Sequence, residues 1–458
     1  MSQEEKKIEI TEIQTLKELQ AIFDTYLLMA DRDIIKIMCA TVISNQFKGY
    51  PNWLFIVAPS SGGKSEIIQA FFGIKLNGNS LSFPISDLTV NAFASGQKKV
   101  GKETSLLHQI PPGGLLFFKD FTSMVSKARE ARTEIFKQLR EIYDGSYIKR
   151  TGTGDNVHWD GKIGAIAGAT QVIYEFQQEF ATMGDRFIMY CMKQPDRKQL
   201  LDFILDDTRI NADKMAMQHH LKDATSSYIE YIINNMKEDD VHLAPELKED
   251  LKNVADFCTK VRSGVVVDER RPNIINFAPD HEMPVRMINQ LLNLAKAFIV
   301  MRKAEPKGKM LKTDNDKISE EEGLMLYKVA FDSIPIKRRI ALKALAKHEG
   351  GVSTKGLATT INYQTPVVAA WLAQLNALGI CTRQMKGGNQ GDMWNLKKEY
   401  RDIMVKFEHI EVTADSLIDE SEDDDALLDE AWDTRRQDER RSDMGSLEAP
   451  YQGSLDEF

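Results

Sequence analysis

Residues 53–65, WLFIVAPSSGGKS, decide the fold of this chain. The first five are an apolar run of strand length, the next eight form a loop rich in small residues, and residues 66–72 have helical spacing. The loop matches the pattern G-x-x-x-x-G-K-[ST] at its last three positions, with alanine in place of the first glycine. Because backbone N–H groups of such a loop cradle phosphates, the segment predicts a phosphate-binding unit rather than an ordinary turn. The expected phosphate-binding residues are Ala58, Pro59, Ser60, Ser61, Gly62, Gly63, Lys64 and Ser65.

Strand-like and helical segments alternate after this loop. A long helical stretch covers residues 122–143, and from about residue 195 the pattern becomes mainly helical. Apolar runs of strand length lie between the helical stretches, at 81–85, 115–118, 163–167 and 187–192. This alternation predicts an α/β domain with a largely parallel sheet flanked by helices.

The composition is that of a folded globular protein. Of the 458 residues, 42% are hydrophobic and 28% are charged. No run of about 18 apolar residues occurs, so we expect no membrane-spanning helix. The polar start MSQEEKKIEITEIQ is unlike a secretory signal. The four cysteines lie far apart without metal-ligand spacing, which predicts a reducing cytoplasm and neither disulfides nor zinc; they are Cys39, Cys191, Cys258 and Cys381.

The net charge of −9 is unevenly distributed. Residues 410–458 hold 17 acidic and 4 basic residues, whereas residues 1–409 hold 51 acidic and 55 basic ones. A mildly basic body with a strongly acidic tail favours nucleic acid as a partner of the body. We expect the tail to be disordered. Its end, GSLDEF, leaves open either a docking role for a protein partner or a solubilising role.

The segment GLLFFKDF, residues 114–121, is the expected second strand of the phosphate site. In P-loop enzymes such a strand ends in an acid that holds Mg²⁺. Asp120 is the acid at this position, while Lys64 is expected at the β- and γ-phosphates and the Ser65 hydroxyl at the metal. The alternative is a buried strand that ends in a solvated aspartate.

Further segments, in order along the chain, resemble those of the AAA+ ATPases. Within that family they look most like the minichromosome-maintenance (MCM) type of helicase and the phage and mobile-element ATPases related to it. The resemblance covers roughly residues 30–330, and it rests on the order of the segments because none after the phosphate loop is specific alone. The segments are GLLFFKDFTSM (114–124), SYIKRTGTGDNVHW (146–159), IGAIAGATQV (163–172), MGDRFIMYCMKQPD (183–196) and VRMINQLLNLAKAF (285–298).

The resemblance implies ATP and Mg²⁺ as ligands and assigns further roles. Thr170 would be the polar residue of the sensor-1 strand, and Arg286 would begin the sensor-2 helix that senses the γ-phosphate. Arg186 would be an arginine finger supplied by the neighbouring subunit, which implies a homo-oligomeric ring, a hexamer. One departure is that the family's adjacent Asp-Glu pair aligns with Lys119 and Asp120, so Asp120 would serve the metal, the attacking water or both. This departure predicts slow hydrolysis.

Residues 146–159 are expected to form a β-hairpin that contacts DNA. In the resembled helicases such hairpins line the channel and track the phosphate backbone. Tyr147, Lys149 and Arg150 provide a ring for stacking and charges for phosphates, a combination that suits single-stranded DNA. An ordinary solvated hairpin is the alternative.

Residues 330–400 are expected to form a winged helix-turn-helix. Three helical segments precede two strands around GGNQGD, at 336–348, 353–362, 365–379 and 381–396. Because the later helix of such a motif enters a major groove, we expect duplex DNA here, with protein contact as the alternative. The expected contacts are Lys355, Arg383 and Lys386, together with Gln364, Thr365, Lys397 and Lys398.

The sequence therefore predicts an ATP-dependent DNA helicase or translocase that serves phage or mobile-element replication, in the cytoplasm of a bacterial host if it is phage-encoded. Two alternatives stay open. Lys119 favours an ATP-switched DNA-binding initiator, helicase loader or transcriptional regulator, and the phosphate loop also fits a P-loop kinase. The predicted parts are an N-terminal helical segment (1–50), an AAA+ core (51–200), a helical lid (201–318), the winged-helix domain (319–405) and the acidic tail (406–458).

Overall fold

A computed structural model describes most of the chain. The described residues are 12–89, 93, 106–150, 156–176, 186–206, 213–237, 241–268, 271, 274–306, 317–385 and 391–412. Several predicted features lie outside them: the acidic tail from residue 413 onward, the hairpin turn at 151–155, residues 183–185 of the arginine-finger segment, and residues 386–390 of the wing.

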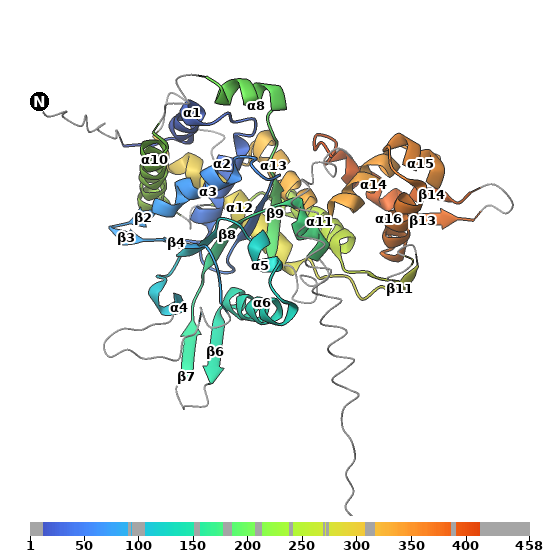
Figure 1. Cartoon of the computed structure of the whole chain (residues 1–458), viewed down its shortest axis with the longest axis horizontal. Coiled ribbons are helices and arrows are strands. Elements are labelled where there is room, and N and C mark those ends of the chain that lie inside the picture. The colour runs from blue at the N-terminus through green and yellow to red at the C-terminus, as the bar shows by residue number, and fades with distance from the viewer. Residues whose placement is uncertain are drawn as a thin grey trace, which may run out of the picture.

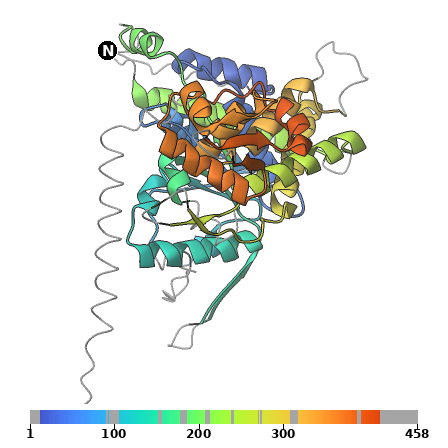
Figure 2. The same ribbon diagram turned by 90° about the vertical axis from the view of Figure 1, so that its right-hand side faces the viewer.

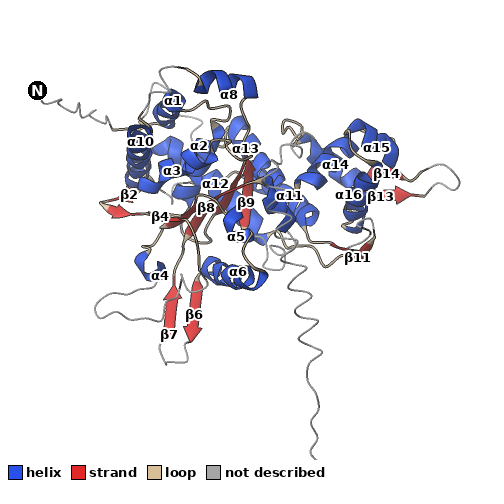
Figure 3. Ribbon diagram, viewed as in Figure 1, coloured by secondary structure: helices blue, strands red, loops and turns tan. Residues whose placement is uncertain are grey.

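A five-stranded parallel sheet forms the centre of the molecule (Figures 1 and 3). Its order is β4-β5-β8-β1-β9, so β1 lies between β8 and β9. This order differs from those of the doubly wound dinucleotide-binding and flavodoxin-like sheets. The predicted α/β fold with a parallel sheet flanked by helices is confirmed. The strands are β1 (Trp53–Val57), β4 (Ser82–Ile85), β5 (Leu115–Phe118), β8 (Gly164–Ala169) and β9 (Phe187–Cys191).

Helices cover both faces of this sheet. On one face, α6 (Arg129–Asp144) places Tyr143 edge-on against Trp53, with ring centres 5.2 Å apart. On the other face, α3 (Lys64–Ala70) lies so close to β8 that a side chain at Gly168 would meet Ile68 at 2.8 Å. Because β1, β5 and β8 are covered on both sides, they are buried along their whole length, as is usual for parallel strands.

A set of helices extends this core. Helix α10 packs on α3 and α1, α12 packs on α2, and α11 packs on α12. Short segments complete this part: β2 (Lys75–Leu76), β3 (Asn79–Ser80), α4 (Leu106–Gln109), α5 (Thr122–Val125), β10 (Val266–Val267), β11 (Ile275–Phe277), η1 (Phe71–Gly73) and η2 (Gln171–Phe176). The longer helices are α1 (Leu16–Tyr26), α2 (Asp33–Ser44), α8 (Arg197–Ile204), α10 (Lys214–Asn235), α11 (Pro245–Arg262) and α12 (Val285–Ala304).

Helix α13 (Glu320–Asp332) packs against β9 and against α11 and α12. The sequence-based boundary at 318/319 assigns this helix to the C-terminal domain. In the structure it is the layer that covers the edge strand of the central sheet.

The C-terminal part combines helices with a small antiparallel sheet, and it lies to the right of the central sheet in Figure 1. The Ser353 hydroxyl accepts from the Gly356 N–H at 3.0 Å and so caps α15. The sheet has the order β12-β14-β13. The elements are α14 (Ile336–Ala346), β12 (Val352–Ser353), α15 (Thr354–Thr360), α16 (Thr365–Ala377), β13 (Cys381–Gln384), β14 (Met393–Leu396), η4 (Lys398–Tyr400) and α17 (Arg401–Val405).

A two-stranded antiparallel ribbon of β6 (Ser146–Arg150) and β7 (Asn156–Asp160) projects from the body, as both views show (Figures 1 and 2). The predicted hairpin strands are therefore present. Within the described residues, no helix is long and apolar enough to cross a membrane.

Candidate functional site

The phosphate loop lies at the carboxyl edge of the sheet. The Ala58 N–H donates to the carbonyl of Ala169 at 3.1 Å, which extends the β1–β8 ladder by one bond. The loop then turns through left-handed backbone at Ser61 (φ 60°) and Gly63 (φ 77°) before α3 begins at Lys64. These two positive φ values bend the loop tightly in front of the strand.

The Lys64 ammonium is enclosed by this loop. Its Nζ donates to the carbonyl of Pro59 at 3.1 Å and to that of Ala58 at 3.4 Å, and the side chain is 7% exposed. At Gly63, a Cβ would meet nothing within 4 Å, so the space beside the loop is open. A curled loop that holds a cation and adjoins open space fits a nucleotide phosphate group.

The loops after β5 and β8 meet at the same edge. The Phe121 N–H donates to the Gly168 carbonyl at 2.7 Å, and the Thr170 N–H donates to the Thr122 hydroxyl at 3.3 Å. Asp120 is exposed, and its Oδ1 accepts from the Thr122 N–H at 2.9 Å. The structure thus brings Asp120 and Thr170 to the edge where the phosphate loop ends.

The Thr170 hydroxyl is a buried polar group near the phosphate loop, and it forms no hydrogen bond with the described residues. Thr170 is 6% exposed, and its Oγ1 has no hydrogen-bond partner among the described residues. Buried hydroxyls are nearly always hydrogen-bonded, so an orphaned one at this edge fits a site that receives a polar ligand or a water.

One carboxylate is available here for a metal. Mg²⁺ is usually held by one or two carboxylates together with substrate phosphates and waters. Asp120 and the Ser65 hydroxyl fit that pattern. Lys119 is exposed and forms no ion pair with a described residue, and the described part of the chain contains no cluster of three or more His, Cys, Asp or Glu side chains suited to a metal.

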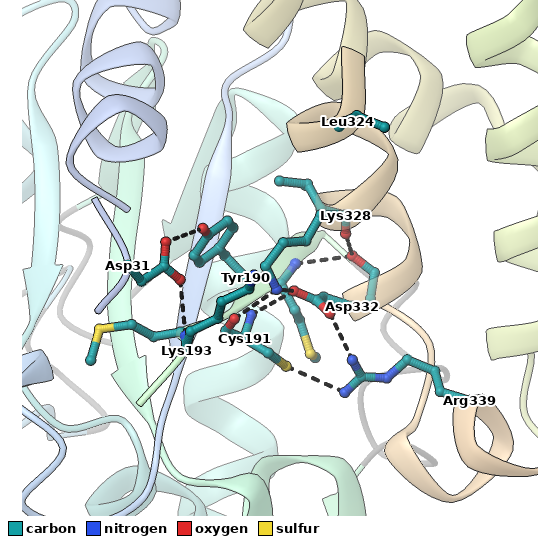
Figure 4. A network of polar contacts seen from close by, with 12 residues as sticks. Asp31, Tyr190, Cys191, Lys193, Leu324, Lys328, Asp332 and Arg339 are labelled. Atoms are coloured by element: carbon teal, nitrogen blue, oxygen red, sulfur yellow. Dashed lines mark hydrogen bonds and ion pairs between the residues drawn. The ribbon is translucent and has the colours of Figure 1, made fainter. Parts of the chain in front are cut away.

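Sequence reasoning missed a fourth segment at this edge, residues 192–194. The Met192 N–H donates to the Val57 carbonyl at 2.9 Å, and Gln194 lies against the loop so closely that a Cβ on Gly62 would meet its Oε1 at 2.6 Å. Asp31 holds this segment by accepting from the Lys193 N–H at 2.9 Å and from the Tyr190 hydroxyl at 2.8 Å (Figure 4). The available signal was that polar residues directly follow a buried parallel strand.

Arg186 lies at the opposite, amino edge of the sheet. It directly precedes β9, whose first residue pairs with Trp53, the first residue of β1. A five-residue strand is about 16 Å long, so Arg186 and the phosphate loop of the same chain are separated by the depth of the sheet.

The Arg186 guanidinium has local partners at that edge. It donates to the Asp144 carboxylate at 2.7 Å and lies 5.5 Å from the centre of the Tyr143 ring. Burial lowers the pKa of Arg186, and Asp144 offsets part of that effect. Arg186 is 5% exposed, so contact with a neighbouring subunit requires exchange of its contact with Asp144.

Arg286 lies at the same amino edge. It is in the first turn of α12, where the Gln290 side chain donates to the Arg186 carbonyl at 2.6 Å and the Asn52 side chain donates to the Gln290 carbonyl at 3.2 Å. Arg286 also contributes to the lowered pKa of Arg186, since the two positive charges repel. The structure therefore brings Arg186 and Arg286 together and separates both from Lys64.

The expectation that Tyr147 offers a ring for stacking is not met. Tyr147 is 4% exposed and pairs across the ribbon with Trp159, and burial raises its pKa to about 12. Its ring packs at the base of the ribbon because every second side chain of a strand points to the same face. Arg150 is exposed and Lys149 is half-buried.

Of the expected contacts in the C-terminal part, Lys355 is exposed on α15. Arg383 pairs with Asp392 at 2.6 Å and lies 5.5 Å from the Trp394 ring centre, so its charge is partly engaged. Lys386 lies outside the described residues.

No family model matches this chain, and no curated protein matches it. A function for this chain is therefore inferred from the geometry of the residues described above.

Proposed function

We propose that this protein is an ATPase of the AAA+, MCM-like type that uses ATP and Mg²⁺ to translocate on or unwind DNA. The observation that carries the proposal is the separation described above. Lys64 and the phosphate loop lie at one edge of the sheet, whereas Arg186 and Arg286 lie at the other. A chain built in this way completes its site with a second copy.

Each residue has a part in the proposed reaction. The loop N–H groups and Lys64 would bind the phosphates, and Asp120 with Ser65 would hold the metal, which when bound would neutralise charge on the phosphate oxygens. Thr170 directs its hydroxyl at the attacking water or the γ-phosphate. Arg186 and Arg286 of the neighbouring copy stabilise the charge that develops in the transition state.

Contacts that join unlike edges of successive copies are heterologous, and they close into a ring when the rotation permits. We propose such a ring, a hexamer, with the β6–β7 ribbon directed at single-stranded DNA through Arg150 and Lys149. We further propose that residues 336–396 are a winged helix-turn-helix, in which α15 and α16 are the helix pair and the β13–β14 connection is the wing.

The steady-state ATPase rate with and without single-stranded DNA tests this function. Wild type is expected to hydrolyse ATP faster with DNA, and Lys64→Ala is expected to lose turnover in both conditions. Lys75→Ala is the matched control, because Lys75 is an exposed lysine on β2 outside the loop. ATP binding without turnover, with DNA present, would rule out the motor.

A second candidate is an ATP-switched DNA-binding initiator, loader or regulator. The observation that favours it is that an exposed lysine, Lys119, precedes Asp120. The end of β5 therefore has one carboxylate, whereas the ATPases that this chain resembles have two. Tight ATP binding, negligible turnover and ATP-dependent binding to duplex DNA would support this candidate over the motor.

A further inference from the structure

The junction between α13 and α14 is bonded directly to the last residue of β9. The Asp332 carboxylate accepts from the Cys191 N–H at 2.7 Å and from the Arg339 guanidinium at 2.7 Å (Figure 4). Lys328 links the same two elements, because its Nζ donates to the Cys191 carbonyl at 2.7 Å and to Asp332 at 2.5 Å. Asp332 is 0% and Arg339 2% exposed, so these charged hydrogen bonds form away from water.

The same cluster includes η2, the segment that follows Thr170. The Tyr174 hydroxyl donates to the Asp332 carbonyl at 2.7 Å, and Arg339 donates to that hydroxyl at 3.1 Å. Burial opposes the charge on Arg339, yet Cys191, Tyr174 and Asp332 together raise its pKa above the ordinary value. The cluster therefore keeps the Arg339 charge and joins the segments that follow β8 and β9 to α13 and α14.

Beyond Cys191, the chain continues to the phosphate loop. Met192 is hydrogen-bonded to Val57, the residue before the loop, and Gln194 lies against Gly62 within it. A continuous path of bonded or touching groups thus runs from Asp332 through residues 191–194 to the loop. At its other end, α14 packs on α15, α16 and β14 of the C-terminal domain.

A buried hydrogen bond adds little net stability, but breaking it is costly because a donor or an acceptor is left unsatisfied away from water. Helix α13 therefore cannot separate from the end of β9 without breaking the bonds of Asp332 to the Cys191 N–H and of Lys328 to the Cys191 carbonyl. A shift of residues 191–194 against the loop therefore strains the bonds of Cys191 to α13, which the Asp332–Arg339 ion pair joins to α14.

We propose that Asp332 is a positioning residue of the phosphate-loop site, which holds residues 191–194 against the loop and couples nucleotide binding there to DNA binding by the C-terminal domain. This inference rests on the proposed nucleotide-binding function. Because such coupling is reciprocal, DNA changes the ATP affinity by the same factor by which ATP changes the DNA affinity.

The test compares two buried carboxylates on the same helix, in the full chain. Asp332→Asn keeps the shape but removes the charge, and it sets an amide N–H₂ against donors in either orientation, Cys191 and Lys328 on one side or Arg339 on the other. Glu322→Gln is the control, because Glu322 is also 0% exposed on α13 but pairs with Lys36 and Arg302 instead of β9. Lys328→Met removes the bonds of Lys328 to the Cys191 carbonyl and to Asp332 but keeps the Asp332 carboxylate on the Cys191 N–H, and it is the milder variant should Asp332→Asn not fold.

The first readout is amide hydrogen exchange without ligand. Asp332→Asn is expected to raise exchange in residues 57–65 as well as at Cys191, whereas Glu322→Gln leaves the loop as in wild type. Faster exchange at Cys191 with an unchanged loop would overturn the proposal, and so would a loop loosened equally by Glu322→Gln.

The second readout is the affinity for a fluorescent ATP analogue with Mg²⁺, with and without a DNA oligonucleotide. Wild type is expected to show a ratio of Kd values of about fivefold or more between the two conditions, and Asp332→Asn a ratio near one. An unchanged ratio in Asp332→Asn would overturn the coupling. Absence of ATP binding by wild type would instead overturn the proposed function, while the exchange result would still decide whether Asp332 positions the loop.

Discussion

Arg186 and Lys64 lie at opposite ends of two neighbouring parallel strands. Arg186 precedes β9, Lys64 follows β1 by one loop, and the two strands are in register from Trp53–Phe187 to Val57–Cys191. Their separation is therefore fixed by the sheet, and no side-chain rotation within one chain brings the guanidinium to the loop.

This relationship predicts complementation between inactive variants. Lys64→Ala and Arg186→Ala are each expected to lose turnover by about a hundredfold or more, since in the proposed reaction each removes a charge that would stabilise the transition state. In an equimolar mixture, about a quarter of the sites would combine an intact Lys64 with an intact Arg186 from the next copy. The ATPase rate of the mixture, corrected for either variant alone, measures this. A mixture as inactive as its components would show that Arg186 does not act in trans.

Thr170 is expected to show opposite effects on stability and activity. Thr170→Val removes a buried hydroxyl that has no hydrogen-bond partner among the described residues, which should raise the free energy of unfolding by about 1 kcal/mol. The same change should lower ATP turnover by about tenfold or more, because the hydroxyl is then missing from the site. Urea denaturation and the ATPase rate provide the two measurements.

Thr122→Val is the matched control for this pair of measurements. The Thr122 hydroxyl accepts from the Thr170 N–H, so its removal leaves that N–H unsatisfied and should lower stability. If Thr170→Val hydrolyses ATP at the wild-type rate, the Thr170 hydroxyl takes no part in the reaction.

Lys119 is expected to limit hydrolysis. Lys119→Asp places two adjacent acids at the end of β5, as in the resembled ATPases, and should increase both turnover and the apparent affinity for Mg²⁺. Because Lys119 is exposed, the change should alter stability by less than about 0.5 kcal/mol. ATPase rates over a Mg²⁺ titration measure the effect, with Lys119→Ala to separate loss of the lysine from gain of the acid. If Lys119→Asp is no faster than Lys119→Ala, the second acid has no role.

The stability of Glu305→Gln is expected to differ from that of wild type by an amount that depends on pH. Burial raises the pKa of this carboxyl, although its Oε1 accepts from the Leu16 N–H at 2.9 Å and from the Tyr228 hydroxyl at 2.8 Å. Glu305→Gln can retain both bonds without the buried charge.

The sign of this difference follows from linkage. A carboxyl whose pKa is higher in the folded state contributes stability below its unfolded pKa of 4.5, and this contribution is lost as the pH rises through the raised value. Glu305→Gln should therefore be more stable than wild type at pH 7, with the difference shrinking towards pH 4. Denaturant unfolding of both proteins across this range measures it, and a difference independent of pH would contradict the cause given.

Much of the sheet was predictable because parallel strands that are covered on both faces consist of uninterrupted apolar residues, as at residues 53–57 and 115–118. The phosphate loop was predictable because it is local in sequence. Asp31 and Asp332 were not, because their partners in β9 and the following residues lie 141 to 162 positions away and no spacing encodes such contacts.

The orientation of Tyr147 shows another limit. A basic and aromatic composition indicates a nucleic-acid contact, but the alternation of a strand decides which side chain faces solvent. The neighbouring Ile148 is 58% exposed, whereas Tyr147 is buried.

The packing of α13 on β9 limits the positions at which the C-terminal domain of this protein can be exchanged for another. Recombination at 318/319, where composition suggests a seam, would take away Asp332, Lys328 and Arg339 and leave the buried ends of β9 and η2 without their partners. A foreign C-terminal domain grafted there would have to reproduce these side chains on two helices of its own. The exchangeable unit therefore begins after α14, and α13 and α14 have to stay with the central sheet.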